Sequence, residues 1–173
     1  MEESRILAIN PGSTSTKIAV YQGSKSIFLK NIKHTAEELQ PFKKIVDQFH
    51  FRKEIILKEL KEADINVNQI VAIVGRGGLV KPIESGVYEV NDQLMADLHE
   101  SKLGEHASNL GGLIADDMIK SIKGARAFIA DRVVVDELED VARYTGHPKF
   151  VRQSIFHALN QKAIARKHAN AVD

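Results

Sequence analysis

The chain has 173 residues, 43% of them hydrophobic, so it is long enough to bury a core and lacks the composition of a disordered tail. Its 24 basic and 23 acidic residues are spread along the sequence and only 6% of residues are aromatic, which argues against nucleic acid or an acidic membrane surface as partner. The absence of cysteine excludes disulfides, thiol catalysis and thiolate metal sites, and favours the cytoplasm.

At the amino end, Glu2 and Glu3 precede an apolar run too short for a secretory signal, and no later run approaches the roughly 20 residues that span a bilayer. Residues 6–21 then predict a strand, a polar glycine turn and a second strand. The turn is rich in hydrogen-bond donors, and Gly12 can adopt a positive φ and let a ligand approach the backbone. This hairpin therefore predicts a phosphate-binding turn.

The following segments predict a sheet covered by helices. Residues 26–32 continue an antiparallel meander, and after a polar connection the pattern becomes helical from about Asp47, with one apolar face holding Phe49, Ile56, Leu60 and Ala63. Residues 70–74 predict a buried strand that ends at Gly75. An irregular loop rich in Gly and Pro follows.

The second half alternates between helix and strand. Helices are expected over 91–101 and 106–122, a short strand over 127–130, a turn or short helix over 136–144, and a long helix from about Ser154. The order β-β-β-α-β-α-β-α indicates the α/β class with a mixed sheet flanked by helices. Ligands are expected outside the carboxyl ends of its strands.

Two general phosphate motifs fail. A Walker loop needs G-x-x-x-x-G-K-[ST], and residues 12–17 lack the second glycine. The dinucleotide fingerprint fails because residues 75–80 end in valine where the third glycine belongs. The remaining interpretation is a phosphate-binding turn between two strands.

That hairpin resembles the signature of the acetokinase family: residues 8–17 read Ala-Ile-Asn-Pro-Gly-Ser-Thr-Ser-Thr-Lys, and every specified position of the pattern matches. Further blocks are similar to the butyrate kinase branch of that family, at residues 75–83, 105–112, 136–138 and 155–161. The acetate branch carries His-Arg-Val-Val-His-Gly around its arginine, and this sequence does not, which argues against acetate as the preferred substrate.

The resemblance implies a ribonuclease H-like, actin-like lobe of a two-lobed kinase. In the intact enzyme, ATP and butanoate would give ADP and butanoyl phosphate, with Mg²⁺ as cofactor and a phosphotransacylase as metabolic neighbour. Residues 1–173 are expected to form a single actin-like N-terminal domain, with the adenosine-binding second domain outside this chain. The intact enzyme is expected to be a homo-oligomer, and the isolated lobe to be inactive.

Phosphoryl transfer requires alignment and neutralisation of charge on the equatorial oxygens. Arg76, expected on a glycine-rich loop leaving the 70–74 strand, can hold a carboxylate or phosphoryl group by two bonds; the alternative is a surface arginine. Asp131 lies where actin-like kinases keep an acid that orients the acceptor or a magnesium-bound water, although an Asp at a strand end also caps helices or forms turns. Arg132 stands where the branch usually has proline, and it could add positive charge.

Within the hairpin, Asn10, Gly12, Ser13 and Ser15 are the expected phosphate-binding residues, although such side chains also simply close turns. Lys17 is expected to point away from the turn because of strand alternation.

The resemblance also selects His106 as a substrate-binding residue and His157 as a catalytic residue, with packing or capping roles as the alternatives. Phe156 is a candidate wall of the pocket, and the alternative is an ordinary core phenylalanine. No metal site made of protein ligands is expected. Gly77 and Gly78, which replace valines of the acetate branch, are expected to leave room for a longer alkyl tail.

Two alternatives to butanoate phosphorylation remain at this point. One is a kinase for branched or other short acids such as isobutyrate, which a substrate panel would distinguish. The other is a non-catalytic phosphate-binding or assembly module, which applies if the native chain ends at residue 173.

Overall fold

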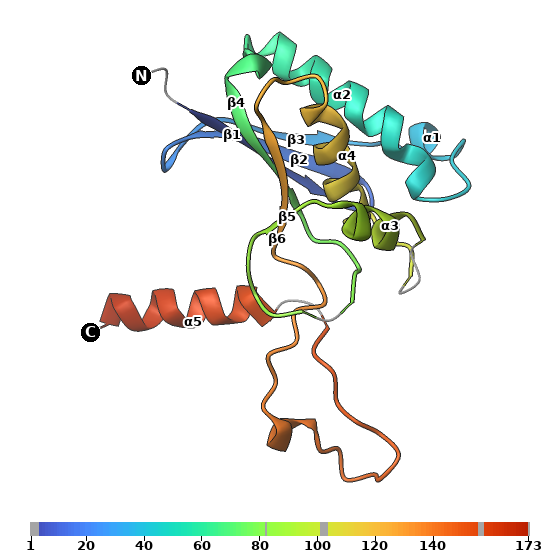
Figure 1. The fold of residues 1–173 in the computed structure, drawn as a ribbon, viewed down its shortest axis with the longest axis vertical. Helices are drawn as coiled ribbons and strands as arrows, with labels where there is room; N and C mark the ends of the chain where they lie inside the picture. The colour runs from blue at the N-terminus through green and yellow to red at the C-terminus, as the bar shows by residue number, and fades with distance from the viewer. Residues whose placement is uncertain (1–3, 82, 101–103, 156–157, 173) are drawn as a thin grey trace.

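The computed structural model describes residues 4–81, 83–100, 104–155 and 158–172. Within them a six-stranded sheet has the order β3-β2-β1-β4-β6-β5 (Figure 1). The strands are β1 (Arg5–Pro11), β2 (Ser15–Gln22), β3 (Lys25–Lys33), β4 (Ile70–Arg76), β5 (Tyr88–Glu89) and β6 (Arg126–Ala130). Strands β1, β2 and β3 form the expected antiparallel meander, β4 and β6 run parallel to β1, and β5 pairs antiparallel with β6. The predicted α/β class and mixed sheet are confirmed.

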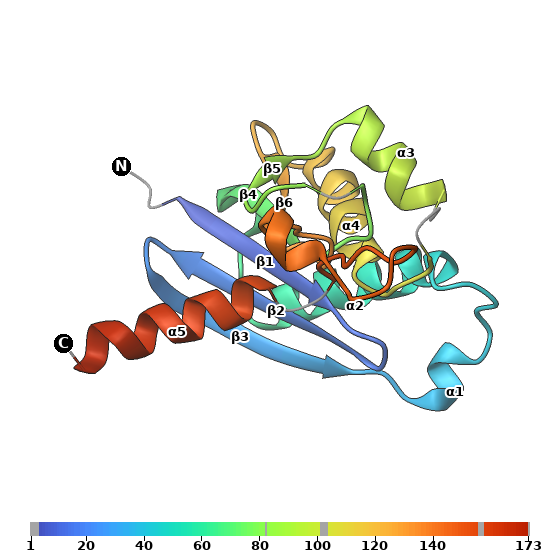
Figure 2. The same ribbon diagram turned by 90° about the horizontal axis from the view of Figure 1, so that it is seen from below.

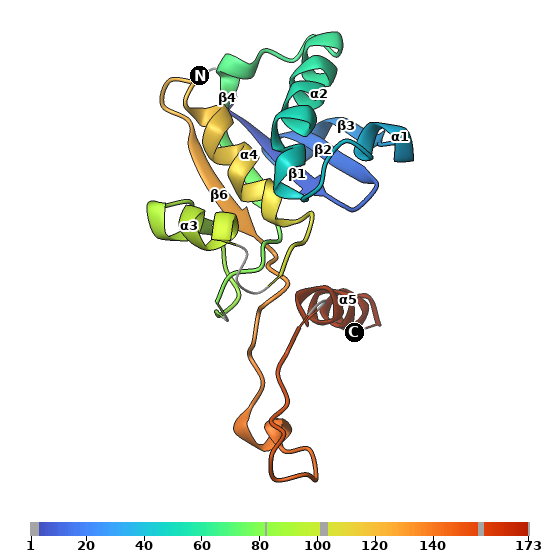
Figure 3. The same cartoon turned by 90° about the vertical axis from the view of Figure 1, so that its right-hand side faces the viewer.

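The α-helices are α1 (Ala36–Leu39), α2 (Phe49–Glu62), α3 (Asp92–Glu100), α4 (Asn109–Ile119) and α5 (Ala158–Val172). Short 3₁₀ segments are η1 (Val46–Gln48), η2 (Val67–Gln69) and η3 (Asp140–Arg143). Helices α2 and α4 cover one face of the sheet (Figure 3), and α1 lies beyond the end of β3 (Figure 2). After β6 the chain runs away from the sheet as an arm that contains η3 (Figure 1).

The core lies between the sheet and these two helices. Alternation along β1 buries Leu7 and Ile9, and the predicted face of α2 buries Ile56 and Leu60. Helix α4 is buried along most of its length, and its expected apolar positions at 110, 114, 118 and 122 are all in the core. Burying such side chains contributes roughly 1.5–3 kcal/mol each.

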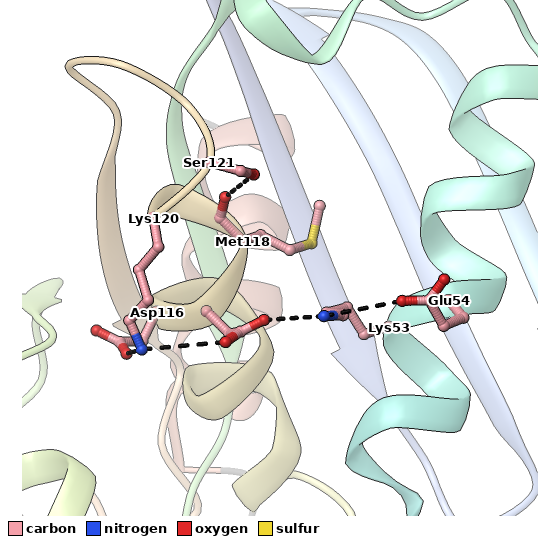
Figure 4. A network of polar contacts seen from close by, with 7 residues as sticks. Lys53, Glu54, Asp116, Met118, Lys120 and Ser121 are labelled. Atoms are coloured by element: carbon pink, nitrogen blue, oxygen red, sulfur yellow. Dashed lines mark hydrogen bonds and ion pairs between the residues drawn. The ribbon is translucent and has the colours of Figure 1, made fainter.

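Polar contacts tie the two covering helices together where their sides meet solvent. Lys53 Nζ of α2 lies 3.1 Å from Asp117 Oδ2 of α4, and Nζ of Lys120, the C-cap residue of α4, lies 2.8 Å from Asp116 Oδ2 (Figure 4). Such partly exposed pairs contribute about 0–1 kcal/mol each, so they orient the helices more than they stabilise them.

Glycines permit an unusually close approach of α4 to β4. A Cβ atom on Gly75 would lie 2.3 Å from the carbonyl carbon of Gly111, and one on Gly111 would lie 3.2 Å from Arg76 O. Because no side chain separates the two backbones, the start of α4 lies directly beside the end of β4. This contact places the segment before α4 next to Arg76.

Some expected element boundaries were wrong. Strand β4 extends two residues further than expected, so Arg76 ends the strand instead of lying on a loop. The helix expected from residue 106 begins at Asn109, and the helix expected from Ser154 begins at Ala158. Strand β5 and helix α1 were not expected: two residues show little periodicity, and α1 depends on its capping box between Thr35 and Glu38.

Candidate active site

A cavity of about 350 Å³ opens where β1, β4 and β6 end. These strands are parallel, so their carboxyl ends meet at one edge of the sheet, as expected for a ligand site. The cavity is lined by Asn10, Pro11, Gly12, Ser13, Ser15, Lys17, Arg76, Gly77, His106, Ser108, Asp131, Arg132 and Val133. The fold thus brings together Arg76, Asp131, His106 and the four expected hairpin residues from distant parts of the sequence.

The β1–β2 turn forms one wall of this cavity. Gly12 N–H donates to Ser15 O at 2.7 Å and closes the turn. Gly12 does not use the positive φ that glycine permits. Lys17 was expected to point away, yet it lines the cavity, because Thr16 takes the buried position and alternation turns Lys17 to the open side.

We expect Gly12→Ala to weaken phosphate binding without lowering the stability of the fold. An added Cβ would meet Ser15 O at 3.5 Å and Ser15 Oγ at 3.6 Å, which are ordinary contacts, so the free energy of unfolding should stay level or rise by about 0.4–1 kcal/mol. Inorganic phosphate should bind at least about threefold more weakly, because the methyl group occupies the cavity wall. Chemical denaturation and a phosphate titration of the same variant measure both. Unchanged phosphate affinity would contradict a close approach at Gly12.

Arg76 and Asp131 meet across the ends of β4 and β6. Arg76 Nε donates to Asp131 Oδ2 at 2.6 Å, and both side chains remain partly exposed. Asp131 has a φ of 49°, a left-handed conformation that Asp tolerates better than most residues. Among the described residues this is the only side-chain bond of Arg76, so its two terminal nitrogens are available for an anion.

The loop after β4 is held by backbone geometry. Gly77 N–H donates to Ala130 O at 2.9 Å, and Gly77 and Gly78 both have positive φ. A Cβ on Gly77 would lie 2.4 Å from Ser108 Cβ, and one on Gly78 would lie 3.1 Å from Leu98 Cδ2. The expectation that both glycines enlarge the pocket was wrong for Gly78, since its missing side chain leaves room for Leu98 and not for the cavity.

The segment before α4 forms the opposite wall. His106 Nδ1 accepts from Ser108 N–H at 3.2 Å and lies 2.7 Å from Ser108 Oγ, so a neutral His106 carries its proton on Nε2. Asn109 Oδ1 accepts from Leu79 N–H at 2.8 Å and fixes the glycine loop. Because α4 begins at Asn109, the positive end of its dipole lies at the cavity edge.

Arg132 is a buried residue of the cavity lining, with its guanidinium carbon 4.0 Å from the centre of the Tyr88 ring. Burial lowers the pKa of Arg132. With Lys17 and Arg76 it gives the lining residues three cationic side chains against the single carboxylate of Asp131. The cavity therefore favours an anion such as a phosphoryl group or a carboxylate.

Arg52 is the most important residue that the sequence did not reveal. It is 1% exposed and holds the turn from behind, with hydrogen bonds to Gly12 O, Ser13 O and Ser15 O. A signal was present: Arg52 precedes Ile56 and Leu60 at four-residue intervals, which places a charge on the buried face of α2. Thr16 and His34 were missed as well, and they complete this network.

His34 is expected to make stability depend on pH. Its Nε2 lies 2.8 Å from Thr16 Oγ1, and burial, followed by the nearby charge of Arg52, lowers the pKa of His34 below 6.5. The unfolded chain therefore binds this proton more readily than the folded chain. Stability due to neutral His34 is complete above pH 6.5 and is lost as the pH falls through the window between 6.5 and the lowered folded value.

Denaturation between pH 7 and 5 measures this effect, and the slope for one proton approaches about 1.4 kcal/mol per pH unit. His34→Gln should flatten the profile, whereas His147→Gln on the arm should leave it unchanged. Equal slopes in wild type and His34→Gln would contradict the assignment.

His157 and Phe156, expected from the sequence as a catalytic residue and a pocket wall, lie outside the described residues. Among the described residues, no group of three or more His, Cys, Asp or Glu side chains is arranged to hold a metal ion. A search of the described helices found none with the length and apolar character needed to cross a membrane.

Solved structures with a similar fold include acetate kinase from Entamoeba histolytica, with a TM-score of 0.61 and 15% identity, covering 98% of this chain and 47% of that chain. Acetate kinase from Porphyromonas gingivalis follows, with a TM-score of 0.55 and 15% identity over 84% of this chain and 41% of that chain. The chain therefore has the actin-like ATPase fold, with a cavity that contains cationic side chains at the carboxyl edge of its sheet.

No model of a known protein family matches the chain. Butyrate kinase 2 and butyrate kinase 1 of Clostridium acetobutylicum are 53% and 55% identical to it, over 95% and 97% of this chain and 46% and 47% of their own lengths. The chain is thus a homologue of butyrate kinases. It spans about half the length of these curated relatives.

Proposed function

We propose that this chain is a carboxylate kinase domain, and that the whole protein transfers the γ-phosphoryl group of ATP to butanoate, forming ADP and butanoyl phosphate. The observation that carries this proposal is the meeting of the hydroxyl-rich hairpin, Arg76 and Asp131 at one cationic cavity. The names of the homologous enzymes favour butanoate as the acceptor.

In this reaction a carboxylate oxygen of butanoate attacks the γ-phosphorus, and a new O–P bond forms as the bond to the bridging β,γ-oxygen breaks. No proton is transferred, because the attacking oxygen is already anionic and ADP leaves with the negative charge. Catalysis is then alignment and neutralisation of charge. We propose that the terminal nitrogens of Arg76 bind the transferring phosphoryl group, while Asp131 accepts the hydrogen bond from Arg76 Nε.

The hairpin supplies neutral donors. Asn10, Ser13 and Ser15 line the cavity, and their amide and hydroxyl groups can donate to phosphoryl oxygens without introducing a further charge. Gly12 allows the oxygens to approach the backbone. His106, with Nδ1 occupied by Ser108, is assigned a donor role toward carboxylate or phosphoryl oxygens through Nε2. We also propose His157, from the family resemblance, as a catalytic residue and Phe156 as a wall of the pocket.

The residues present fit a magnesium ion held largely by phosphate oxygens and water. Mg²⁺ is commonly bound through one or two carboxylates together with substrate phosphates, and Asp131 is the carboxylate that lines the cavity. We propose that Asp131 holds Mg²⁺ through a water molecule. When bound, the ion would neutralise charge on the phosphates.

The remaining parts of the proposal concern the whole protein. We propose that residues 1–173 form one actin-like lobe. An adenosine-binding lobe outside this chain would complete the ATP-binding site. We also propose a cytoplasmic homo-oligomer coupled to a phosphotransacylase. The half-length match to the curated relatives supports the two-lobed arrangement.

Assay of the product of the whole gene tests the function. Acyl phosphate formed from ATP and Mg²⁺ with acetate, butanoate or isobutyrate is trapped with hydroxylamine. Two additional methylenes at about 0.8 kcal/mol each should favour butanoate over acetate by about tenfold or more. A preference for acetate would overturn the substrate. The absence of acyl phosphate from every acid would overturn the kinase function and favour a binding module.

A further inference from the structure

Arg52 is a buried cation whose hydrogen-bond partners are neutral. It lies in the first turn of α2, 1% exposed, and no ion pair joins it to an acid among the described residues. Buried charges are expensive unless they are paired or fully hydrogen-bonded. Burial lowers its pKa to about 10, so Arg52 is still a cation at neutral pH. A charge retained in such a place needs a structural or functional explanation.

Its hydrogen bonds converge on one short segment. Nη1 donates to Gly12 O at 2.8 Å, to Ser15 O at 3.1 Å and to Thr16 Oγ1 at 2.9 Å. Nη2 donates to Ser13 O at 3.1 Å. From the other side, Gln48 Oε1 accepts from Nε at 3.0 Å and from Nη2 at 2.8 Å, which fixes the plane of the guanidinium. The Arg52–Gln48 pair thus holds the turn 12–16.

The direction of these carbonyls determines the direction of the neighbouring amides. In a planar trans peptide the C=O and the following N–H point to opposite sides. Since Gly12 O and Ser13 O point to Arg52, the N–H groups of Ser13 and Thr14 point away from it. Arg52 is not among the residues that line the cavity, whereas Gly12, Ser13 and Ser15 are, so the turn lies between Arg52 and the cavity.

We propose that Arg52 is a positioning residue for phosphoryl transfer, which orients the turn 12–16 so that its amides and hydroxyls can receive a phosphoryl group. The proposal rests on the proposed function. Arg52 acts through the turn and does not touch the ligand. Lysine cannot replace it, because the planar guanidinium places five donors on three nitrogens and reaches several acceptors at once, whereas an ammonium carries its three donors on one nitrogen.

Phosphate binding and amide exchange of the 173-residue chain test the proposal. The probe is inorganic phosphate, titrated into wild type, Arg52→Lys and Arg126→Lys while the amide signals of residues 12–16 are followed by NMR. Arg126 is an exposed arginine of β6 paired with Glu89 of β5, so Arg126→Lys controls for the same chemical change away from the turn.

For Arg52→Lys we expect at least tenfold weaker phosphate binding and at least tenfold faster hydrogen exchange of the turn amides, with exchange at Ile9 and Ile73 unchanged. Arg126→Lys should match wild type in both measurements. If Arg52→Lys keeps wild-type phosphate affinity, Arg52 acts through its charge or not at all, and the positioning role is overturned.

Gln48→Met provides a second variant should Arg52→Lys fail to fold. It keeps the charge of Arg52 but removes the acceptor that fixes the guanidinium plane. Phosphate binding at least threefold weaker would support the proposal, and unchanged binding would overturn it. If phosphate leaves the turn amides of wild type unshifted, the proposed phosphate site itself fails. In that case amide exchange still tests whether Arg52 holds the turn 12–16. Exchange of the turn amides that is no faster in the variants than in wild type would exclude this role.

Discussion

Replacing Arg76 by glutamine is expected to lower kcat/KM for butanoyl phosphate formation by about 10³-fold or more in the product of the whole gene. Arginines that stabilise a transferring phosphoryl group contribute about 10³–10⁵-fold to kcat, and single oxyanion donors about 10²–10³-fold. Arg76 has the geometry for this role because Asp131 holds only Nε, at 2.6 Å, and leaves the terminal nitrogens of the guanidinium for the anion.

Glutamine is shorter than arginine, has two N–H donors in place of five and carries no charge, so it cannot neutralise the transferring group and the expected decrease falls mainly on kcat. Acyl phosphate trapping over a range of butanoate concentrations separates kcat from KM. Arg126→Gln, which alters an exposed arginine by the same chemical change, serves as the control. Arg76→Lys should recover only part of the rate, since an ammonium cannot make a bidentate contact. A decrease of less than tenfold in Arg76→Gln would remove Arg76 from the proposed reaction.

Gly75→Ala is expected to destabilise the chain by about 1–3 kcal/mol or more. The added Cβ would lie 2.3 Å from Gly111 C, 2.4 Å from Gly111 O and 2.7 Å from Gly112 N. All three atoms are backbone, so no side chain can rotate away and the helix must move from the sheet. Since α4 follows the cavity residues His106 and Ser108, the same shift should open the site.

Urea denaturation measures the change in the free energy of unfolding. Gly12→Ala is the matched control, because the same substitution at that position meets nothing closer than 3.5 Å. A change below about 0.5 kcal/mol in Gly75→Ala would show that α4 and β4 can separate at little cost, and would contradict the close packing described for them.

Local sequence patterns were sufficient for most of the fold. Short apolar runs beside turn residues identified β1, β2 and β4, and helical spacing of apolar residues identified the buried faces of α2 and α4. These patterns are set by the geometry of each element and need no knowledge of its neighbours. Short elements such as α1 and β5 escaped, because a single turn or a residue pair contains less than one period of the pattern.

The candidate site was accessible from the sequence only in part. The motif over residues 8–17 indicated the hairpin residues, and the resemblance indicated Arg76, Asp131 and His106, which the fold places around one cavity. The directions of Lys17 and of the absent side chain at Gly78 could not be obtained in this way. Both depend on the tertiary structure, because Lys17 faces the cavity and the space beside Gly78 is occupied by Leu98.

The sequence by itself determined the order of the elements, their buried faces and the chemical character of the turn, because each of these follows from residues close together in the chain. Only the tertiary structure decided that Arg52 is buried, that its fork meets carbonyls and a hydroxyl 36 to 40 residues away, and that Gly12 needs no positive φ. The physical reason is that a charge can be buried only where acceptors surround it, and the folded chain alone brings those acceptors together.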